Sequence, residues 1–138
     1  MSSFTAEKQP RPKFRNLSFP LLLTYRLPLP GVVSIMHRIS GAALFLMLPL
    51  FLWLFDLSLM SELSFERLRG IADNFFFKLL LVFLIWGFFH HLAAGIRYLL
   101  LDLHIGIDLN SARASALAVY AVSLPLTFIA AMKVFGVF

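Results

Sequence analysis

Cysteine is absent from this sequence and charged residues are scarce. Without cysteine, the chain cannot form disulfides or supply cysteine ligands to zinc or to an iron–sulfur cluster. Only 14% of the 138 residues are charged, against about 25% in a typical soluble domain. Hydrophobic residues make up 60%, and the mean hydropathy is +0.87. A soluble fold of this size could not cover so much apolar surface, which excludes a soluble globular enzyme.

Three long runs without any charged residue divide the chain. They contain 17, 18 and 19 residues, at positions 39–55, 79–96 and 114–132. A helix needs roughly 20 mostly apolar residues to cross a bilayer core, and each run reaches that length with its uncharged flanks. The runs also lack the alternation of a strand. We therefore expect an all-α membrane protein, one domain over residues 1–138, with transmembrane helices at about 32–57, 75–103 and 111–135.

Proline marks the N-terminal segment and the interior of two predicted helices. Because five prolines fall within residues 1–30, we expect that segment to be non-helical and to lie along the membrane surface. Its prolines and Glu7 fit neither a signal peptide nor a transit peptide, so no targeting segment is expected. Pro49 and Pro125 are expected to kink the first and third helices.

The distribution of lysine and arginine predicts the orientation. Eight of these residues lie before or at the start of the first helix, or towards the loop between the second and third helices. The other four, Arg67, Arg69, Lys78 and Lys133, lie on the opposite side. Because positive charge favours the cytoplasmic side, the N-terminus is predicted inside and the C-terminus outside.

Polar residues at the inner end of the first helix form the first candidate site. Ser34, His37, Arg38 and Gly41 have offsets of 0, 3, 4 and 7, which place them on one helical face. A guanidinium there suits a carboxylate, such as a haem propionate, or a carbonyl oxygen. The alternative is that Arg38 reaches lipid phosphate and His37 merely lies at the interface.

His91, deeper in the second helix, is the second candidate. Gly87 and Gly95 flank it by one turn on each side and suggest a shallow groove that a planar macrocycle could approach. His90 points about 100° away, towards a more crowded face. Haem ligation and a hydrogen bond to a neighbouring helix both remain open for His91. A second ligand would come from His37 or from a partner subunit.

Two motifs make the chain recognisable. The first is Ser34-x-x-His37-Arg38-x-Ser40-Gly41, preceded by Tyr25-Arg26-Leu27-Pro28, and the second is His91-x-x-x-Gly95-Ile96-Arg97, followed by Asp102. With them, the chain resembles the cytochrome b556 subunits of succinate dehydrogenase, the haem-bearing membrane anchors of respiratory complex II. The resemblance covers nearly the whole chain. Tyr98 is a departure, because some relatives have histidine there.

The resemblance implies roles for these residues. His91 would be one axial ligand of a haem b iron, the other coming from a second hydrophobic anchor subunit. His37 and Arg38 would lie near the haem propionates, and Ser34 and Arg38 would line a ubiquinone pocket. Asp102 and His104, in or beside the inner loop, are a candidate proton route to that quinone.

The resulting reading is a multi-pass membrane anchor that is not catalytic alone. In a bacterial inner membrane it would join a flavoprotein subunit and an iron–sulfur subunit as part of succinate:ubiquinone oxidoreductase. One alternative is the anchor of a fumarate reductase that uses menaquinone. Another is a structural anchor without haem. The sequence does not distinguish the direction of catalysis, the quinone, the haem potential or the oligomeric state of the complex.

Overall fold

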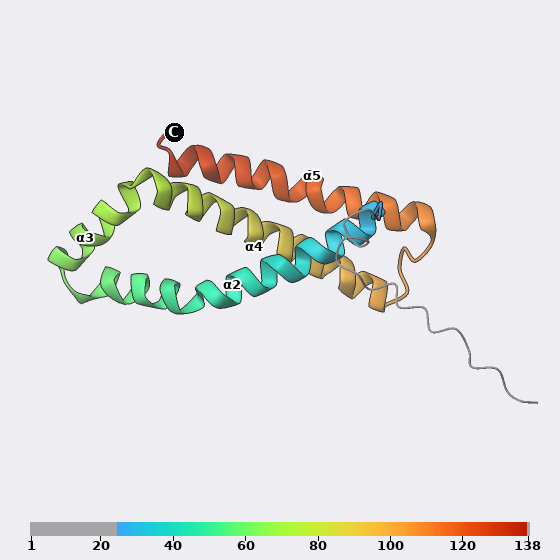
Figure 1. The fold of residues 1–138 in the computed structure, drawn as a ribbon, viewed down its shortest axis with the longest axis horizontal. Helices are drawn as coiled ribbons and strands as arrows, with labels where there is room; N and C mark the ends of the chain where they lie inside the picture. Colours follow the sequence, from blue (N-terminus) through green and yellow to red (C-terminus); the bar gives the residue numbers. More distant parts are fainter. Residues whose placement is uncertain (1–24, 138) are drawn as a thin grey trace, which may run out of the picture.

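The computed structural model describes residues 25–137, and every regular element in that part of the chain is helical. The second of three long helices runs antiparallel to the first and to the third, and a short helix joins the first two (Figure 1). They are α2 (Leu29–Met60), α3 (Glu62–Asp73), α4 (Phe75–Asp102) and α5 (Leu109–Val134). The all-α prediction is confirmed, and so are three helices long and apolar enough to cross a membrane.

Local sequence signals explain where the helices begin. Asn74 and Asp108 accept hydrogen bonds from the first backbone N–H groups of α4 and α5, which would otherwise lack partners. The helix α2 has Pro30 in its first turn, where a missing N–H costs nothing. It therefore begins at Leu29, three residues before the expected start. Most of the N-terminal segment predicted to be non-helical lies outside the described residues.

The short helix α3 has no counterpart in the sequence prediction. Ser61 and Ser64 form a reciprocal capping box at its N-terminus. Charged residues interrupt the segment, while Leu63 and Phe65 remain exposed. An amphipathic helix of this kind suits the membrane interface and not the bilayer core.

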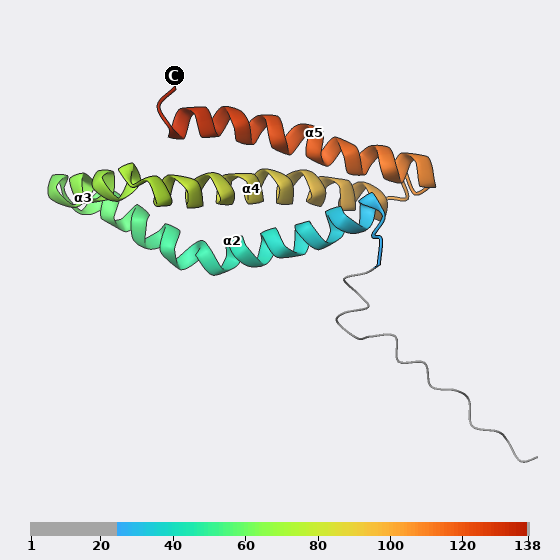
Figure 2. The same ribbon diagram turned by 45° about the horizontal axis from the view of Figure 1, so that its top comes forward.

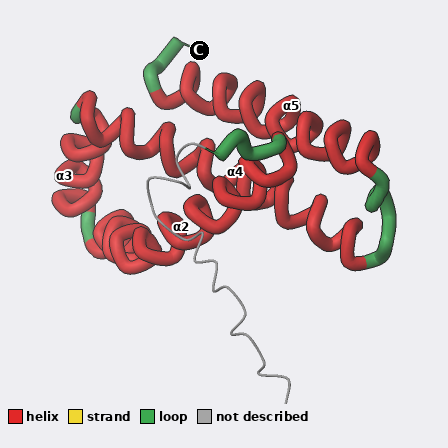
Figure 3. The backbone as a smooth tube through the Cα atoms, turned by 45° about the vertical axis from the view of Figure 1, so that its right-hand side comes forward, coloured by secondary structure: helices red, strands yellow, loops and turns green. Residues whose placement is uncertain are grey.

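The central helix of the bundle is α4, which packs against both α2 and α5. The helix α2 is bent near its middle, in keeping with the kink expected from the internal Pro49 (Figure 2). Short loops join the helices, and the loop after α4 leads to the N-terminus of α5 (Figure 3). The first turns of α2, the last turns of α4 and that loop therefore lie at one end of the bundle (Figure 1).

Burial in the bundle is reversed relative to a soluble protein. Large apolar side chains face outwards, with Phe45 74% and Phe76 77% exposed. Several polar side chains are buried instead, among them Ser40, His90 and Arg97. Such an apolar exterior fits a lipid environment, in which polar groups are placed between helices.

Candidate functional site

His37 of α2 and His91 of α4 come together at the interface between these helices. Their rings are stacked, with centroids 4.1 Å apart and planes 10° from parallel. Tyr98, about two helical turns further along α4, lies with its ring centroid 5.1 Å from that of His37. The structure thus joins residues from the two sequence motifs in one site.

The two ring nitrogens of His91 have different surroundings. Nδ1 lies 3.0 Å from the backbone carbonyl oxygen of His37 and 3.3 Å from the hydroxyl oxygen of Ser40. Within residues 25–137, Nε2 has no hydrogen-bond partner, and the side chain is only partly buried. An imidazole held through one nitrogen, with the other left over, is the usual arrangement of a metal-ligating histidine. His91 therefore fits the role of an axial haem ligand.

Glycine allows α2 to approach the ring of His91. A Cβ atom on Gly41 would lie 2.7 Å from Cε1 of His91, closer than real contacts allow. Gly87 and Gly95 also face α2, since Cβ atoms there would lie 3.8 Å from Ser40 Cβ and 3.7 Å from His37 Nε2. The sequence analysis suggested that these two glycines border a shallow groove that a planar macrocycle could approach. That expectation is wrong, because α2 occupies the space beside them.

His37 does not fit the role of a second ligand to the same iron. Its ring lies flat against His91, so the two imidazoles cannot approach one metal from opposite sides. Nor do residues 25–137 contain a cluster of three side chains that could hold a metal ion by themselves. The sequence analysis considered His37 and a partner subunit as sources of a second ligand. Since the stacking excludes His37, the partner subunit is the source that remains.

His90 is fully buried at the other face of α4. Its ring lies 5.3 Å from those of Trp86 and Tyr120, measured between centroids, and neither ring nitrogen has a well-formed hydrogen bond. The crowded face that the sequence predicted for His90 is confirmed. These surroundings leave no approach for an external ligand.

The remaining predicted site residues gather at the end of the bundle where α2 begins and α4 ends. Ser34 is half-buried and Arg38 is exposed, both on α2. Asp102 ends α4 and His104 follows it with a φ of 62°, and both are exposed. Among the described residues, none of these four side chains is held in a hydrogen bond or an ion pair, so their polar groups are free to meet a ligand or a partner.

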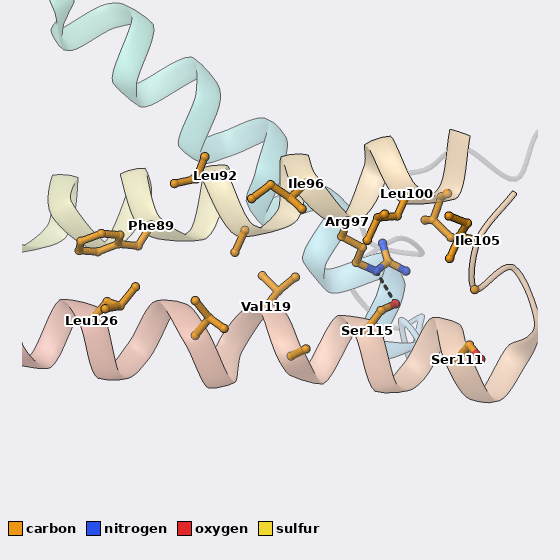
Figure 4. A pocket seen from close by; sticks show the side chains of 15 residues that line it. Phe89, Leu92, Ile96, Arg97, Leu100, Ile105, Ser111, Ser115, Val119 and Leu126 are labelled. Atoms are coloured by element: carbon orange, nitrogen blue, oxygen red, sulfur yellow. Dashed lines mark hydrogen bonds between the residues drawn. The ribbon is translucent and has the colours of Figure 1, made fainter. Parts of the chain in front are cut away.

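Arg97 is a buried residue that the sequence analysis did not single out. It is 6% exposed, and its Nε donates to Ser115 Oγ over 3.0 Å (Figure 4). Its Nη2 donates to the carbonyl oxygen of Ala112 over 3.4 Å, and its guanidinium lies over the ring of Tyr98. Arg97 also borders a mostly apolar groove of about 390 Å³ between α4 and α5. Arg97 is the arginine of the second sequence motif, so the sequence contained a signal for it. Its burial could not be predicted from the motif, because its hydrogen-bond partners lie on another helix.

Comparisons with known proteins identify the family of this chain. Residues 9–130 match the family model described as succinate dehydrogenase/fumarate reductase transmembrane subunit. The chain is 33% identical over 119 residues to the succinate dehydrogenase cytochrome b556 subunit of Paracoccus denitrificans, covering 86% of this chain and 91% of the relative. It is 36% identical over 103 residues to the subunit of the same name from Coxiella burnetii, covering 74% and 82%. A cytochrome b560 subunit from Reclinomonas americana is 28% identical over 116 residues, covering 80% and 81%.

Proposed function

The chain belongs to the succinate dehydrogenase/fumarate reductase transmembrane subunit family, and we propose that it anchors a succinate:ubiquinone oxidoreductase in the membrane. In this role it provides one ligand to haem b and part of the quinone-reduction site. A flavoprotein subunit, an iron–sulfur subunit and a second hydrophobic anchor subunit complete the complex. The membrane is the bacterial inner membrane, and the excess of lysine and arginine at one end supports an N-terminus on the inside.

The observation that carries the haem assignment is the environment of His91. Its Nδ1 is engaged by the His37 carbonyl oxygen, and its Nε2 is the nitrogen that remains for coordination. A haem b bound there supplies one-electron redox chemistry. Because His37 is stacked on His91, the other haem ligand would come from the second anchor subunit. His37 and Arg38 provide hydrogen-bond donors for the propionate carboxylates.

The quinone site lies at the inner end of α2. The hydroxyl of Ser34 and the guanidinium of Arg38 are hydrogen-bond donors that suit a quinone carbonyl oxygen. The two residues lie on the same face of α2, one helical turn from each other. Donors aimed at a carbonyl oxygen favour the negative charge that develops as the quinone accepts electrons.

Protons for the quinone enter from the same end of the bundle. The exposed Asp102 carboxyl and the exposed His104 imidazole lie there, at the end of α4 and in the loop that follows. A carboxyl group and an imidazole can both accept and release protons, which suits a proton route to a membrane-embedded site. The shared location of Ser34, Arg38, Asp102 and His104 supports this division of roles.

The test compares two activities of the complex purified from membranes. Ser34→Ala is expected to raise the KM for ubiquinone, and Asp102→Asn is expected to lower the rate of ubiquinone reduction. Succinate oxidation with an artificial acceptor is expected to stay at the wild-type rate in both. Asp56→Asn, near the opposite end of α2, is the matched control and is expected to change neither activity. Equal loss of both activities in the Asp102→Asn complex would contradict the proton route.

A further inference from the structure

The hydrogen bonds around His91 determine where the proton of its neutral ring lies. A backbone carbonyl oxygen only accepts hydrogen bonds, so the 3.0 Å contact with His37 requires a proton on Nδ1 of His91. A neutral imidazole carries one N–H, and its other nitrogen then has a free lone pair. The contact between α2 and α4 therefore selects the tautomer in which Nε2 is the coordinating atom.

Ser40 takes part in this arrangement as a second acceptor. Its hydroxyl donates to the His37 carbonyl oxygen over 3.0 Å, so the hydrogen of that hydroxyl points away from His91. Its oxygen then offers a lone pair to Nδ1–H of His91, 3.3 Å away. Ser40 is 4% exposed, which keeps water from replacing it. Two acceptors on one rigid helix thus share the same N–H group.

We propose that Ser40 is a positioning residue for the haem ligand, holding His91 as the Nδ1–H tautomer and fixing the orientation of its ring. The proposal rests on the proposed function, in which His91 ligates the iron. An acceptor on Nδ1–H makes Nε2 a stronger donor to the metal, which favours ferric over ferrous iron. Removing Ser40 Oγ weakens that donation and raises the midpoint potential of the haem.

The experiment uses the whole complex purified with Ser40→Ala, Ser40→Thr or Ser123→Ala in this chain. The readouts are the haem midpoint potential from a redox titration and the EPR spectrum of the ferric haem. Threonine keeps a hydroxyl that can bond the carbonyl three residues earlier, as Ser40 does. Ser123 is a fully buried serine of α5 whose hydroxyl has no hydrogen-bond partner among the described residues, and it is the matched control.

The expected result is a raised potential and altered EPR g values in Ser40→Ala, restored in Ser40→Thr and absent in Ser123→Ala. Outer partners of metal ligands typically contribute about tenfold or more to affinity. A tenfold loss of the preference for ferric iron raises the potential by about 59 mV for one electron. A wild-type potential and EPR spectrum in Ser40→Ala would overturn the proposal. So would failure of that complex to assemble, because a positioning residue leaves the fold intact.

A His91→Leu complex separates this proposal from the proposed function. If His91→Leu keeps the haem, the assignment of His91 as ligand fails, and the role of Ser40 fails with it. If His91→Leu loses the haem while Ser40→Ala matches the wild type, the ligand assignment stands and only the positioning role is wrong.

Discussion

His90 and His91 are adjacent in α4, yet their rings have different surroundings. His91 lies against α2, where a carbonyl oxygen and a hydroxyl oxygen contact one ring nitrogen and leave the other free. His90 is fully buried beside Trp86 and Tyr120, and neither of its nitrogens has a well-formed hydrogen bond. The difference shows that a rotation of about 100° around one helix is enough to give adjacent histidines different contacts.

The α2–α4 and α4–α5 interfaces also differ in the kinds of residue that form them. The α2–α4 interface is made of small and polar residues at the site, with Gly41 against His91 and Gly87 against Ser40. The α4–α5 interface holds aromatic rings and the buried Arg97, whose hydrogen bonds stay within the chain. We therefore expect changes in the first interface to alter the haem, and changes in the second to alter stability.

Gly41→Ala is expected to have the largest effect of the substitutions that leave His91 in place. The new Cβ would lie 2.7 Å from Cε1 and 3.1 Å from Nδ1 of His91, which forces the imidazole away from the His37 carbonyl. We expect haem affinity to fall by about tenfold or more, measured as the ratio of haem to flavin in the purified complex. Gly70→Ala in α3, where a Cβ meets nothing within 4 Å, is the control. An unchanged ratio in Gly41→Ala would show that the contact does not position His91.

Ser115→Ala tests the second interface and has an intermediate expected effect. It removes the acceptor of the Arg97 Nε–H group, which is buried. Leaving such a donor without a partner costs about 1–3 kcal/mol, so the thermal unfolding temperature of the complex is expected to fall. The haem spectrum is expected to stay unchanged. Ser123→Ala, on the same helix, removes a hydroxyl that has no partner and is expected to leave the unfolding temperature unchanged or raised. Equal effects of the two substitutions would contradict the account of Arg97.

The smallest effect is expected from a substitution of Asp108, which lies in the loop before α5, away from both interfaces. Hydrogen bonds from the Ser111 side chain and backbone lower the pKa of the Asp108 carboxyl below its ordinary value of 3.8. A lowered pKa in the folded state stabilises the fold above pH 3.8, and this contribution is lost as the pH falls through the folded pKa. Asp108→Asn is expected to flatten that part of the pH dependence of thermal unfolding. A wild-type pH profile in the variant would contradict the N-cap role of the charge.

The sequence predicted the parts of the fold that depend on composition along one helix. Long charge-free runs gave all three long helices within a few residues of their observed bounds. The helix α3 was missed because it is short and charged, and its capping box of Ser61 and Ser64 is a local signal that hydropathy does not contain.

The prediction of the site was limited by what lies on neighbouring helices. Helical geometry separated His91 from the crowded face of His90, which the structure confirms. The same reasoning took Gly87 and Gly95 for an open groove, because nothing in one helix tells which neighbour fills the space beside it. For the same reason the sequence revealed neither the contact of Ser40 with His91 nor the burial of Arg97 against Ser115.

The most direct test of the central claim is a reduced-minus-oxidised absorption spectrum of the complex with either adjacent histidine replaced. The claim predicts that His91→Leu loses the b-type haem band while the flavoprotein and iron–sulfur subunits still copurify. It predicts that His90→Phe keeps the band at wild-type amplitude, because the His90 ring packs against Trp86 and Tyr120 and takes no part in the contacts of His91. A full haem band in His91→Leu, or its selective loss in His90→Phe, would contradict the assignment of His91 as the ligand.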